Sequence, residues 1–394
     1  MLRYDMEAKH ILVIGGGVAG LAAAIELGAE FVHGGSDAFW KLIRSARLKT
    51  VRVPNRFRRL QNGTFQKMDL WQEVGKVMER IDTCAADKSF TRFLAGQRVS
   101  AETRTLVTNF IEGFDAADPK KIGVHGLAAG EEEDDDPGEH QFRLRHGYSG
   151  LVDFLARTAR RLGVRIKTNT VVRSIDWQVN HVKAIGRQNN ARSTFEADAA
   201  IIALPLGVLK AGRFRFKPAL PDKENAIARL PFGNVIKVVL QFKNVFWPGK
   251  NFGFIVAPDL PIPTWWSDSR GPVLTGWVGG PKADALSRQP AASLERIAVA
   301  TLARVLKMDA ALIRSRLSKI HTHDWRKDPF IGGAYSYVPV NGSELPTRLA
   351  APVDNTLYFA GEATVSDSQP GTVHGAFGSG RRAAKEFLAA HDSN

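Results

Sequence analysis

A glycine-rich turn near the N-terminus is the feature that most constrains the fold. The short apolar run His10–Ile14 is followed by Gly15-Gly16-Gly17-Val18-Ala19-Gly20 and then by the helix-forming segment Leu21–Leu27. This order predicts a strand, a tight turn and a helix, the arrangement that binds the diphosphate of a dinucleotide. The helix N-terminus supplies unpaired amides and a positive dipole end for the anion. Gly15, Gly17, Val18, Ala19 and Gly20 are therefore candidate cofactor-binding residues.

A second strand ending in an acid, which normally completes such a site, is not evident after this helix. That acid usually follows the turn by about 20 residues and binds the ribose hydroxyls. Here Leu27 runs directly into Gly28-Ala29-Glu30-Phe31-Val32-His33-Gly34-Gly35, which leaves little room for a further strand. Glu30 and Asp37 are the nearest acids, and one of them would have to replace the usual residue.

The middle of the chain is typical of helices followed by strands. Charged and apolar residues alternate at helical spacing from Asp69 to Phe114, which predicts several amphipathic helices forming a lid or wall. A helix is expected from Gly147 to Arg161. Strands are predicted for Val164–Trp177, Val182–Gly186 and Ala199–Leu204. The last of these leads into Pro205–Lys210, a turn whose backbone could lie against a flat ligand.

A lysine interrupts the apolar segment Phe232–Phe242, which predicts a strand. If Lys237 points inward, it must be paired or have a lowered pKa, which makes it a functional candidate. If it points outward, it is a solvated strand residue. The spacing alone favours neither alternative.

Several motifs in the last third of the chain occur in the order typical of one family. They are Trp325–Pro329, Gly333–Val338, Leu357–Thr364, Gly371–Ala376 and Ser379–Ala384. This series resembles the flavin-containing amine oxidases, which include monoamine oxidases, polyamine oxidases and lysine-specific histone demethylases. The segments Leu204–Lys210, Phe232–Phe242 and Tyr335–Tyr337 are most similar to the polyamine oxidase and demethylase branch.

The resemblance implies an α/β fold with two domains. A discontinuous Rossmann-like FAD-binding domain would comprise residues 1–53, 141–232 and 340–394. A mixed-sheet and helical substrate-binding domain would comprise residues 54–140 and 233–339. The implied activity oxidises the C–N bond of an amine to an imine, with hydride transfer to flavin N5 and reoxidation by oxygen to give hydrogen peroxide. The expected partners are a small-molecule amine and oxygen.

The resemblance also assigns residues to the cofactor. It implies that Val172 gives backbone contacts to the adenine and that Glu362 binds ribityl or ribose hydroxyls. Gly371, Thr372 and Val373 would begin a helix whose N-terminus stabilises the negative charge of reduced flavin. Some relatives attach FAD through a cysteine in the C-terminal part, but this chain has only Cys84, so we expect non-covalent FAD.

A second set of residues is implied for catalysis and substrate binding. Lys237 matches the family lysine that holds a water near flavin N5, and Trp325 would pack beside the isoalloxazine ring. Tyr335 would form one wall of an aromatic cage around the substrate, with Thr372 at the opposite position. His33 lies where many polyamine oxidases carry a histidine near the substrate amine, although it would also suit a satisfied loop position.

The chain departs from the family directly after its first helix. Relatives carry a few tens of residues there, with the second strand, its ribose-binding glutamate and an Arg-Gly-Gly-Arg type turn, whereas here Leu27 precedes Gly28 directly. Loss of a buried acid and of phosphate-facing arginines would weaken cofactor binding. Two hypotheses follow: a working FAD-dependent amine oxidase, or a flavin-poor, catalytically inactive relative that serves as a binding or scaffold protein.

Charge and cysteine content bear on nucleic-acid binding, metal binding and location in the cell. The net charge is +14, and Lys41–Arg59 holds eight basic residues without an acid. We expect a solvated face or an anion groove there, because no nucleic-acid-binding module, stacking platform or zinc spacing accompanies it. The acidic run Glu131–Asp136 suggests a solvated loop and no metal site. One cysteine and the lack of a long apolar segment favour a cytoplasmic protein without a membrane span.

Overall fold

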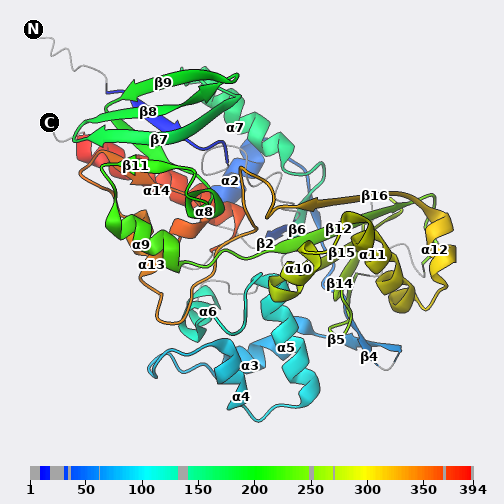
Figure 1. Cartoon of the computed structure of the whole chain (residues 1–394). Coiled ribbons are helices and arrows are strands. Elements are labelled where there is room, and N and C mark those ends of the chain that lie inside the picture. The colour runs from blue at the N-terminus through cyan, green and yellow to red at the C-terminus, as the bar shows by residue number, and fades with distance from the viewer. Residues whose placement is uncertain are drawn as a thin grey trace, which may run out of the picture.

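The computed structural model describes residues 9–17, 31–33, 37–61, 63–131, 141–247, 253–268, 271–366 and 370–391 (Figure 1). Three parallel strands from opposite ends of the chain form one sheet in the order β1 (Ile11–Ile14), β10 (Ala199–Ile202) and β17 (Leu357–Phe359). Parallel pairing places their carboxyl ends at one edge, where Ala203 donates to Ile14 and Ala360 donates to Ile202. This edge carries the glycine turn that the sequence indicates.

The parallel sheet is covered on both faces. On one face, Ala199 and Ile201 pack with Tyr358 against Ala383 of α14 (Val373–His391). On the other face, Ile202 and its neighbours pack against Ile175 and Val182 of a neighbouring mixed sheet and against helices α9 (Pro221–Arg229) and α13 (Leu345–Ala350). Successive side chains of a strand point to opposite faces, so these apolar runs are buried on both sides, as expected of a parallel sheet.

Two further sheets accompany the parallel one. The first, in the order β11-β7-β8-β9, is formed by β7 (Thr170–Gln178), β8 (His181–Gln188), β9 (Ala191–Ala197) and β11 (Arg215–Lys217). The second is formed by β2 (Phe31–His33), β6 (Gln141–Leu144) and β3 (Thr50–Arg52). The strand predicted from Val164 was wrong in its first part. Asn169 has a φ of 52°, which interrupts extended backbone, so the strand begins at Thr170.

Two lysines tie the helices below the parallel sheet together. Lys210, the last residue of α8 (Leu206–Lys210), donates from Nζ to Ile227, Ala228 and Leu230 carbonyls at the end of α9. Lys223 of α9 donates in the same way to the carbonyls of Arg348, Leu349 and Ala351 at the end of α13. The last carbonyls of a helix have no partner within it. An ammonium group donates hydrogen bonds to them and interacts favourably with the negative end of the helix dipole.

A seven-stranded mixed sheet forms the other half of the molecule. Its order is β16 (Leu317–Asp324), β12 (Val235–Phe242), β15 (Val273–Gly279), β14 (Thr264–Asp268), β13 (Phe254–Val256), β4 (Phe57–Gln61) and β5 (Thr64–Met68). The β13–β4 pair is parallel and the other pairs are antiparallel. Three helices accompany it: α10 (Gly280–Ser287), α11 (Ala291–Leu306) and α12 (Ala310–Arg316).

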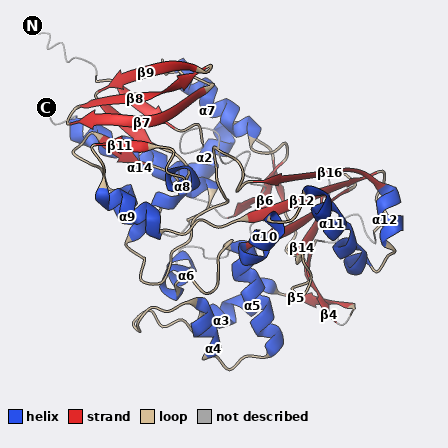
Figure 2. Ribbon diagram, in the orientation of Figure 1, coloured by secondary structure: helices blue, strands red, loops and turns tan. Residues whose placement is uncertain are grey.

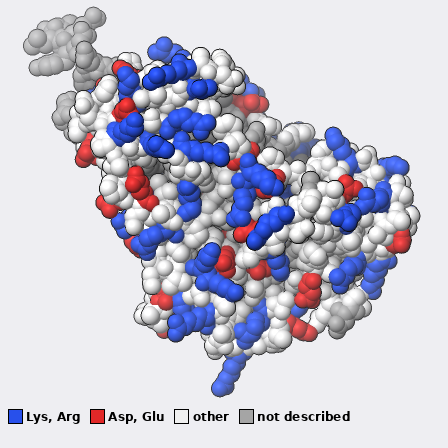
Figure 3. Space-filling view, viewed as in Figure 1, with Lys and Arg blue, Asp and Glu red and all other residues white. Residues whose placement is uncertain are grey.

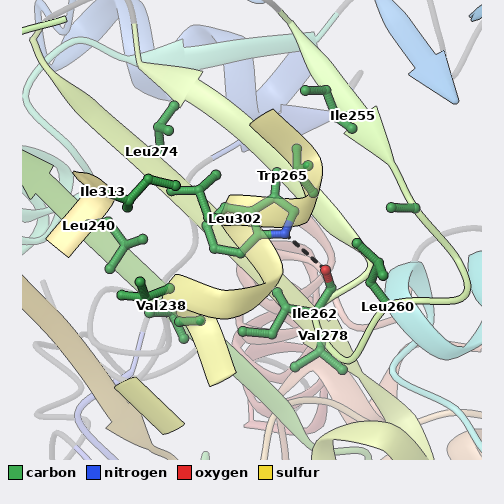
Figure 4. Close-up of a cluster of buried hydrophobic side chains, with 14 of the residues drawn as sticks. Val238, Leu240, Ile255, Leu260, Ile262, Trp265, Leu274, Val278, Leu302 and Ile313 are labelled. Carbon is green, nitrogen blue, oxygen red and sulfur yellow. Dashed lines mark hydrogen bonds between the residues drawn. The ribbon is translucent and has the colours of Figure 1, made fainter. Parts of the chain in front are cut away.

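The hydrophobic core behind this sheet determines which side chains of β12 face it. Val238 and Leu240 of β12 point into a cluster with Leu302 and Ile313 of the helices, shown in Figure 4. Trp265 is fully buried there, and its Nε1 donates to the carbonyl of Ile262. Because side chains alternate along a strand, the odd-numbered residues of β12, Lys237 among them, lie on the opposite face.

Helices lie across that opposite face, as the sequence predicts for residues 69 to 114. They are α3 (Leu70–Met78), α4 (Phe90–Ala95) and α5 (Ala101–Phe114), followed by α6 (Val124–Glu131). Asp69, Ser89 and Ser100 cap the first three, each accepting from the backbone amide three residues on. Two more helices, α2 (Asp37–Ser45) and α7 (Ser149–Arg161), pack on the small β2-β6-β3 sheet.

In Figure 2 the β11-β7-β8-β9 sheet lies apart from the seven-stranded sheet, and the strands of each sheet come from one of the two predicted domains. Every strand of the seven-stranded sheet comes from 54–140 or 233–339, and every strand of the other three sheets comes from the ranges expected to bind FAD. The mixed substrate-side sheet and the parallel cofactor-side sheet agree with the predicted α/β fold; the domain boundaries themselves stay a prediction.

Basic residues are distributed over the surface. The run Lys41–Arg59 is divided among α2, β3 and β4, which belong to different layers. On the face shown in Figure 3, Lys and Arg are spread over both halves of the molecule. Within the described residues, none of the helices is both long and apolar enough to cross a membrane, and there is no group of three or more metal-ligating side chains.

Candidate active site

A cavity of about 670 Å³ lies where the carboxyl edge of the parallel sheet faces the seven-stranded sheet and helices α3 and α5. We call this cavity the chamber. Its wall on the cofactor side includes Gly17, Ala203, Gly361 and Gly371, and its wall on the other side includes Lys237. The chamber therefore joins the two halves of the predicted site in one continuous space.

Lys237 points into the chamber, which decides between the two alternatives left open by the sequence. It is half-buried in β12, opposite Trp277 of β15 and His323 of β16. Its Nζ lies 6.0 Å from the ring centroid of Trp266, within reach of a cation–π interaction. Lys237 thus places an amino group in the chamber wall formed by the seven-stranded sheet.

Tyr335 is held at both ends of its side chain. Its Oη donates to the carbonyl of Phe114 at 2.6 Å, and its ring lies against Gly371. Burial raises the pKa of the Tyr335 phenol, and the negative charges of Asp115 and Glu362 raise it further. The phenol is therefore neutral throughout the ordinary pH range, and its ring forms a fixed wall of the chamber.

Glu362 crosslinks the loops around the chamber. It begins the short 3₁₀ helix Glu362–Thr364 that follows β17, and it accepts hydrogen bonds from the Ser336 amide at 3.1 Å and the Ser336 hydroxyl at 2.7 Å. The Gly371 amide also donates to this carboxylate. Burial raises the pKa of Glu362, and the hydrogen bonds from Ser336 and Gly371 lower it in part. Glu362 lines the chamber and also fixes the segment that carries Tyr335; its role in binding ribityl or ribose hydroxyls stays a prediction.

The turn before α14 brings backbone close to the chamber. Gly371 has a φ of 73°, and a Cβ there would lie 2.9 Å from the Tyr335 ring, so only glycine fits. The Thr372 hydroxyl accepts from the Gly375 amide at 3.0 Å, the bond of a helix N-cap. Both residues and Val373 line the chamber, which agrees with a helix N-terminus directed toward it.

The N-terminal turn is positioned by close packing. Gly15 has a φ of 128°, and a Cβ there would lie 2.2 Å from the carbonyl oxygen of Ala203, so the turn fits against the end of β10 only with glycine. Gly17 is buried and lines the chamber. Val18, Ala19 and Gly20 lie outside the described residues, as do Leu21–Leu27 and Glu30. Asp37 is exposed and begins α2, where an acid stabilises the helix N-terminus.

Three predicted residues are placed away from the chamber wall or are only partly described. Val172 of β7 pairs with Gly186 of β8 and packs on the core between the sheets. Trp325 is buried in a small cluster against which Tyr335 packs, and its ring lies 4.1 Å from that of His323. The backbone of His33 pairs with Gln141, and its side chain lies outside the described part of the structure.

Sequence reasoning missed the residues that form most of the substrate side. Trp71, Phe110 and Phe114 line the chamber from α3 and α5, and Phe254 and Trp266 line it from the sheet. The helical spacing of residues 69 to 114 predicted a wall. Which side chains face the chamber depends on how the helices dock on the sheet, and no local pattern encodes that docking. Ser336, the partner of Glu362, was missed for the same reason.

Comparison with known proteins agrees with this arrangement. The family model for flavin containing amine oxidoreductase matches residues 20–388. The chain belongs to this family. Polyamine oxidase 2 of Arabidopsis thaliana is 32% identical over 336 residues, covering 82% of this chain and 64% of that protein. The family resemblance predicted from the C-terminal motifs is confirmed.

A solved structure of the family has the same fold. Putrescine oxidase bound to putrescine superposes with a TM-score of 0.77 over 97% of this chain and 99% of that one, at 19% identity. The likeness confirms the predicted two-domain amine oxidase fold.

A second relative bears on the missing segment. The alignment with polyamine oxidase 4 of Oryza sativa subsp. japonica, at 26% identity, covers 98% of this chain and 89% of that protein. It runs over 454 positions although this chain has 394 residues, so at least 60 positions have no counterpart here. The alignment length does not place these positions along the chain, and the shortening expected after the first helix stays a prediction. Within the described residues, β1 has β10 as its neighbour, and β2 pairs with β6 in another sheet.

FAD is the cofactor of this family, and the ring end of the site fits it. Gly361 lines the chamber, and a Cβ there would meet only the Leu204 carbonyl at 4.0 Å, so a side chain would occupy space that the glycine leaves open. Gly17, Gly371 and Ala363 add small residues to the same wall. The residues present therefore suit a flat ring lying against backbone.

Proposed function

We propose that this protein is an FAD-dependent amine oxidase that converts an amine and oxygen into an imine and hydrogen peroxide, with water then hydrolysing the imine. One observation carries the proposal. A single chamber is bounded by the glycine-lined edge of the parallel sheet on one side and by Lys237 and Tyr335 on the other. An amine held against the second wall lies next to a ring held against the first.

The cofactor would be held non-covalently by the turn at Gly15 and Gly17, by the strand end at Gly361 and Glu362, and by the N-terminus of α14 at Thr372. When bound, FAD accepts the hydride equivalent and passes the electrons to oxygen. The helix N-terminus favours negative charge on the ring without a cationic side chain. Cys84 is exposed in a loop after α3 and does not line the chamber, which supports non-covalent binding.

The chain's own residues prepare the amine for oxidation. The apolar chamber disfavours the ammonium form, so it lowers the pKa of a bound amine toward the neutral form that can be oxidised. The Tyr335 ring, fixed by Phe114 and Gly371, limits the orientations of the amine. Lys237 would position a water molecule at the inner end. Trp325 would act indirectly, as a member of the buried cluster against which Tyr335 packs.

The second candidate function is a flavin-poor binding or scaffold protein. The observation that favours it is the pairing of β2 with β6 in a separate sheet, because the described residues then offer no acid-bearing strand beside β1. The two functions differ in whether flavin is retained, and a test of activity must therefore be accompanied by a measurement of bound flavin.

The proposal is tested by a peroxide-coupled assay on protein supplied with FAD, using a panel of primary and secondary amines, with oxygen consumption as a second readout. We expect peroxide and oxygen to change in equal amounts with at least one amine. The Lys237→Met variant is the matched control and should lose most of the activity. Protein that binds flavin yet produces no peroxide with any amine in the panel would contradict the proposal.

A further inference from the structure

A histidine stands beside the lysine of the chamber wall. In the register of the seven-stranded sheet, Lys237 of β12 lies opposite Trp277 of β15 on one side and opposite His323 of β16 on the other. Directly opposite residues of antiparallel strands point to the same face, with their Cβ atoms about 5 Å apart. Trp277 and Lys237 line the chamber. His323 is therefore the outer member of a row of three side chains whose inner two belong to the chamber wall.

The imidazole of His323 makes two further contacts. Its ring centroid lies 4.1 Å from that of Trp325, at an interplanar angle of 58°. Its Nε2 lies 3.3 Å from Oδ2 of Asp328. Trp325 is buried in the cluster against which Tyr335 packs. One side chain of β16 thus contacts both the support of Tyr335 and a carboxylate of the following turn.

Asp328 organises the turn that leads toward Tyr335. Its Oδ1 accepts from the Phe330 amide at 2.8 Å, and its carbonyl accepts from the Gly332 amide at 3.0 Å. Because Oδ1 is bonded within the turn, Oδ2 is the atom through which Asp328 meets His323. The ion pair therefore ties this turn to β16.

The two contacts of His323 depend differently on pH. Among the described residues, Asp328 of the turn and Lys237 of β12 are the charged groups that face its imidazole. His321, on the same face of β16, is exposed. The charged side chains next to these are paired elsewhere, Asp324 with Lys327 at 3.0 Å and Arg326 with Asp284 at 2.9 Å. An imidazole is a cation only while protonated, so the ion pair with Asp328 is lost as the pH rises through its titration. The ring contact with Trp325 does not require charge.

We infer that His323 is a positioning residue for amine oxidation, one that holds Trp325 and Asp328 in place. Through these two residues it fixes the Tyr335 ring in the chamber wall. The inference rests on the proposed function for the reaction that this wall serves. His323 is not among the described residues that line the chamber, so it acts through its neighbours. Its replacement should slow hydride transfer more than it weakens the binding of flavin or amine.

Anaerobic stopped-flow reduction of the FAD-supplemented protein tests this inference, because it separates the limiting rate of reduction from amine binding. The reductant is the amine that gives most peroxide in the panel. His323→Phe keeps a ring against Trp325 but removes the ion pair. At about pH 6 wild type should be reduced about two- to fivefold faster than this variant, the value of a partly exposed ion pair, and at about pH 9 equally fast. The ratio of the two rates cancels the ionisation of the amine, which both proteins share.

Three more variants separate the ring contact from the ion pair. Asp328→Asn keeps an acceptor for the Phe330 amide and should give the same ratios as His323→Phe. His323→Ala removes both contacts and should be reduced about two- to tenfold more slowly than wild type even at high pH. The control His321→Ala removes an exposed imidazole of the same strand and should change neither rate. A ratio for His323→Phe that does not vary with pH, or a rate for His323→Ala equal to that of wild type, would overturn the inference.

Near-ultraviolet circular dichroism gives a readout that needs no amine, because its signal reports how tryptophan rings such as Trp325 are held. The wild-type signal should change between about pH 6 and about pH 9, and the change should disappear in His323→Phe and Asp328→Asn but persist in His321→Ala. That result without any reduction of flavin by amines would support the role of His323 and refute the oxidase proposal. A change that persists in all three variants, with reduction rates independent of His323, would refute the role of His323 and leave the oxidase proposal standing.

Discussion

Replacement of Gly371 by alanine tests how the chamber wall is built. The backbone at this position has a φ of 73°, which costs a residue with a Cβ about 1–2 kcal/mol relative to glycine. The added Cβ would also lie 2.9 Å from the Tyr335 ring. That ring cannot tilt freely, because its hydroxyl donates to the Phe114 carbonyl, a bond worth about 1 kcal/mol. We therefore expect Gly371→Ala to destabilise the protein by about 2 kcal/mol.

Gly378→Ala is the matched control for this change. Gly378 lies in the same helix, α14, and a Cβ there would have no heavy atom within 4 Å. Alanine is the better helix former, so the control should stabilise the protein by about 0.5–1 kcal/mol. Urea unfolding measures both variants, and amine oxidation at saturating FAD measures the effect on Tyr335. Equal stability of the two variants, with unchanged oxidation in Gly371→Ala, would refute the proposed packing of Gly371 against Tyr335.

Three further predictions concern a buried lysine, the catalytic lysine and the attachment of flavin. Burial lowers the pKa of Lys223 to about 8 from its usual 10.5, so between these values the unfolded chain binds more protons and stability rises with pH. Urea unfolding should show the free energy of unfolding rising by about 3 kcal/mol over this pH range. The rise should be absent in Lys223→Met, a variant that also loses the donor to three carbonyls. Parallel pH profiles of the two proteins would contradict this. Lys237→Met should retain flavin while anaerobic stopped-flow reduction by amine slows by orders of magnitude, and unchanged reduction would remove Lys237 from the mechanism. Acid precipitation should release the flavin into the supernatant, whereas a yellow pellet would indicate a covalent bond.

Local motifs predicted parts of the backbone on the cofactor side of the molecule. Gly15, Gly371 and the run Leu357–Ala360 report on backbone conformation and strand burial, which neighbouring residues in the sequence determine. The parallel sheet, the turn at β1 and the helix beginning near Gly371 were therefore visible from the sequence. The start of β7 was misplaced, because a single left-handed asparagine ended the extended run earlier than the apolar pattern indicated.

The substrate side depends on contacts between distant segments, so only its helices and strands could be predicted. Lys237 points into the chamber because Val238 and Leu240 pack on helices that follow some 50 to 75 residues later in the chain. Glu362 bonds to Ser336, 26 residues before it. Trp71 and Phe57 meet only after α3 docks on the sheet. Each pairing requires the tertiary structure, so spacing within one segment could not predict it.

The absorbance spectrum of the purified protein tests the central claim most directly. The shortening expected after the first helix would leave Gly15, Gly17, Glu362 and α14 as the groups that bind the cofactor. If these suffice, the protein, purified and then incubated with FAD and freed of excess cofactor, will show flavin bands at a near-stoichiometric level that bleach when an amine is added without oxygen. Protein that shows no flavin bands even after incubation with FAD would contradict the account of an amine oxidase.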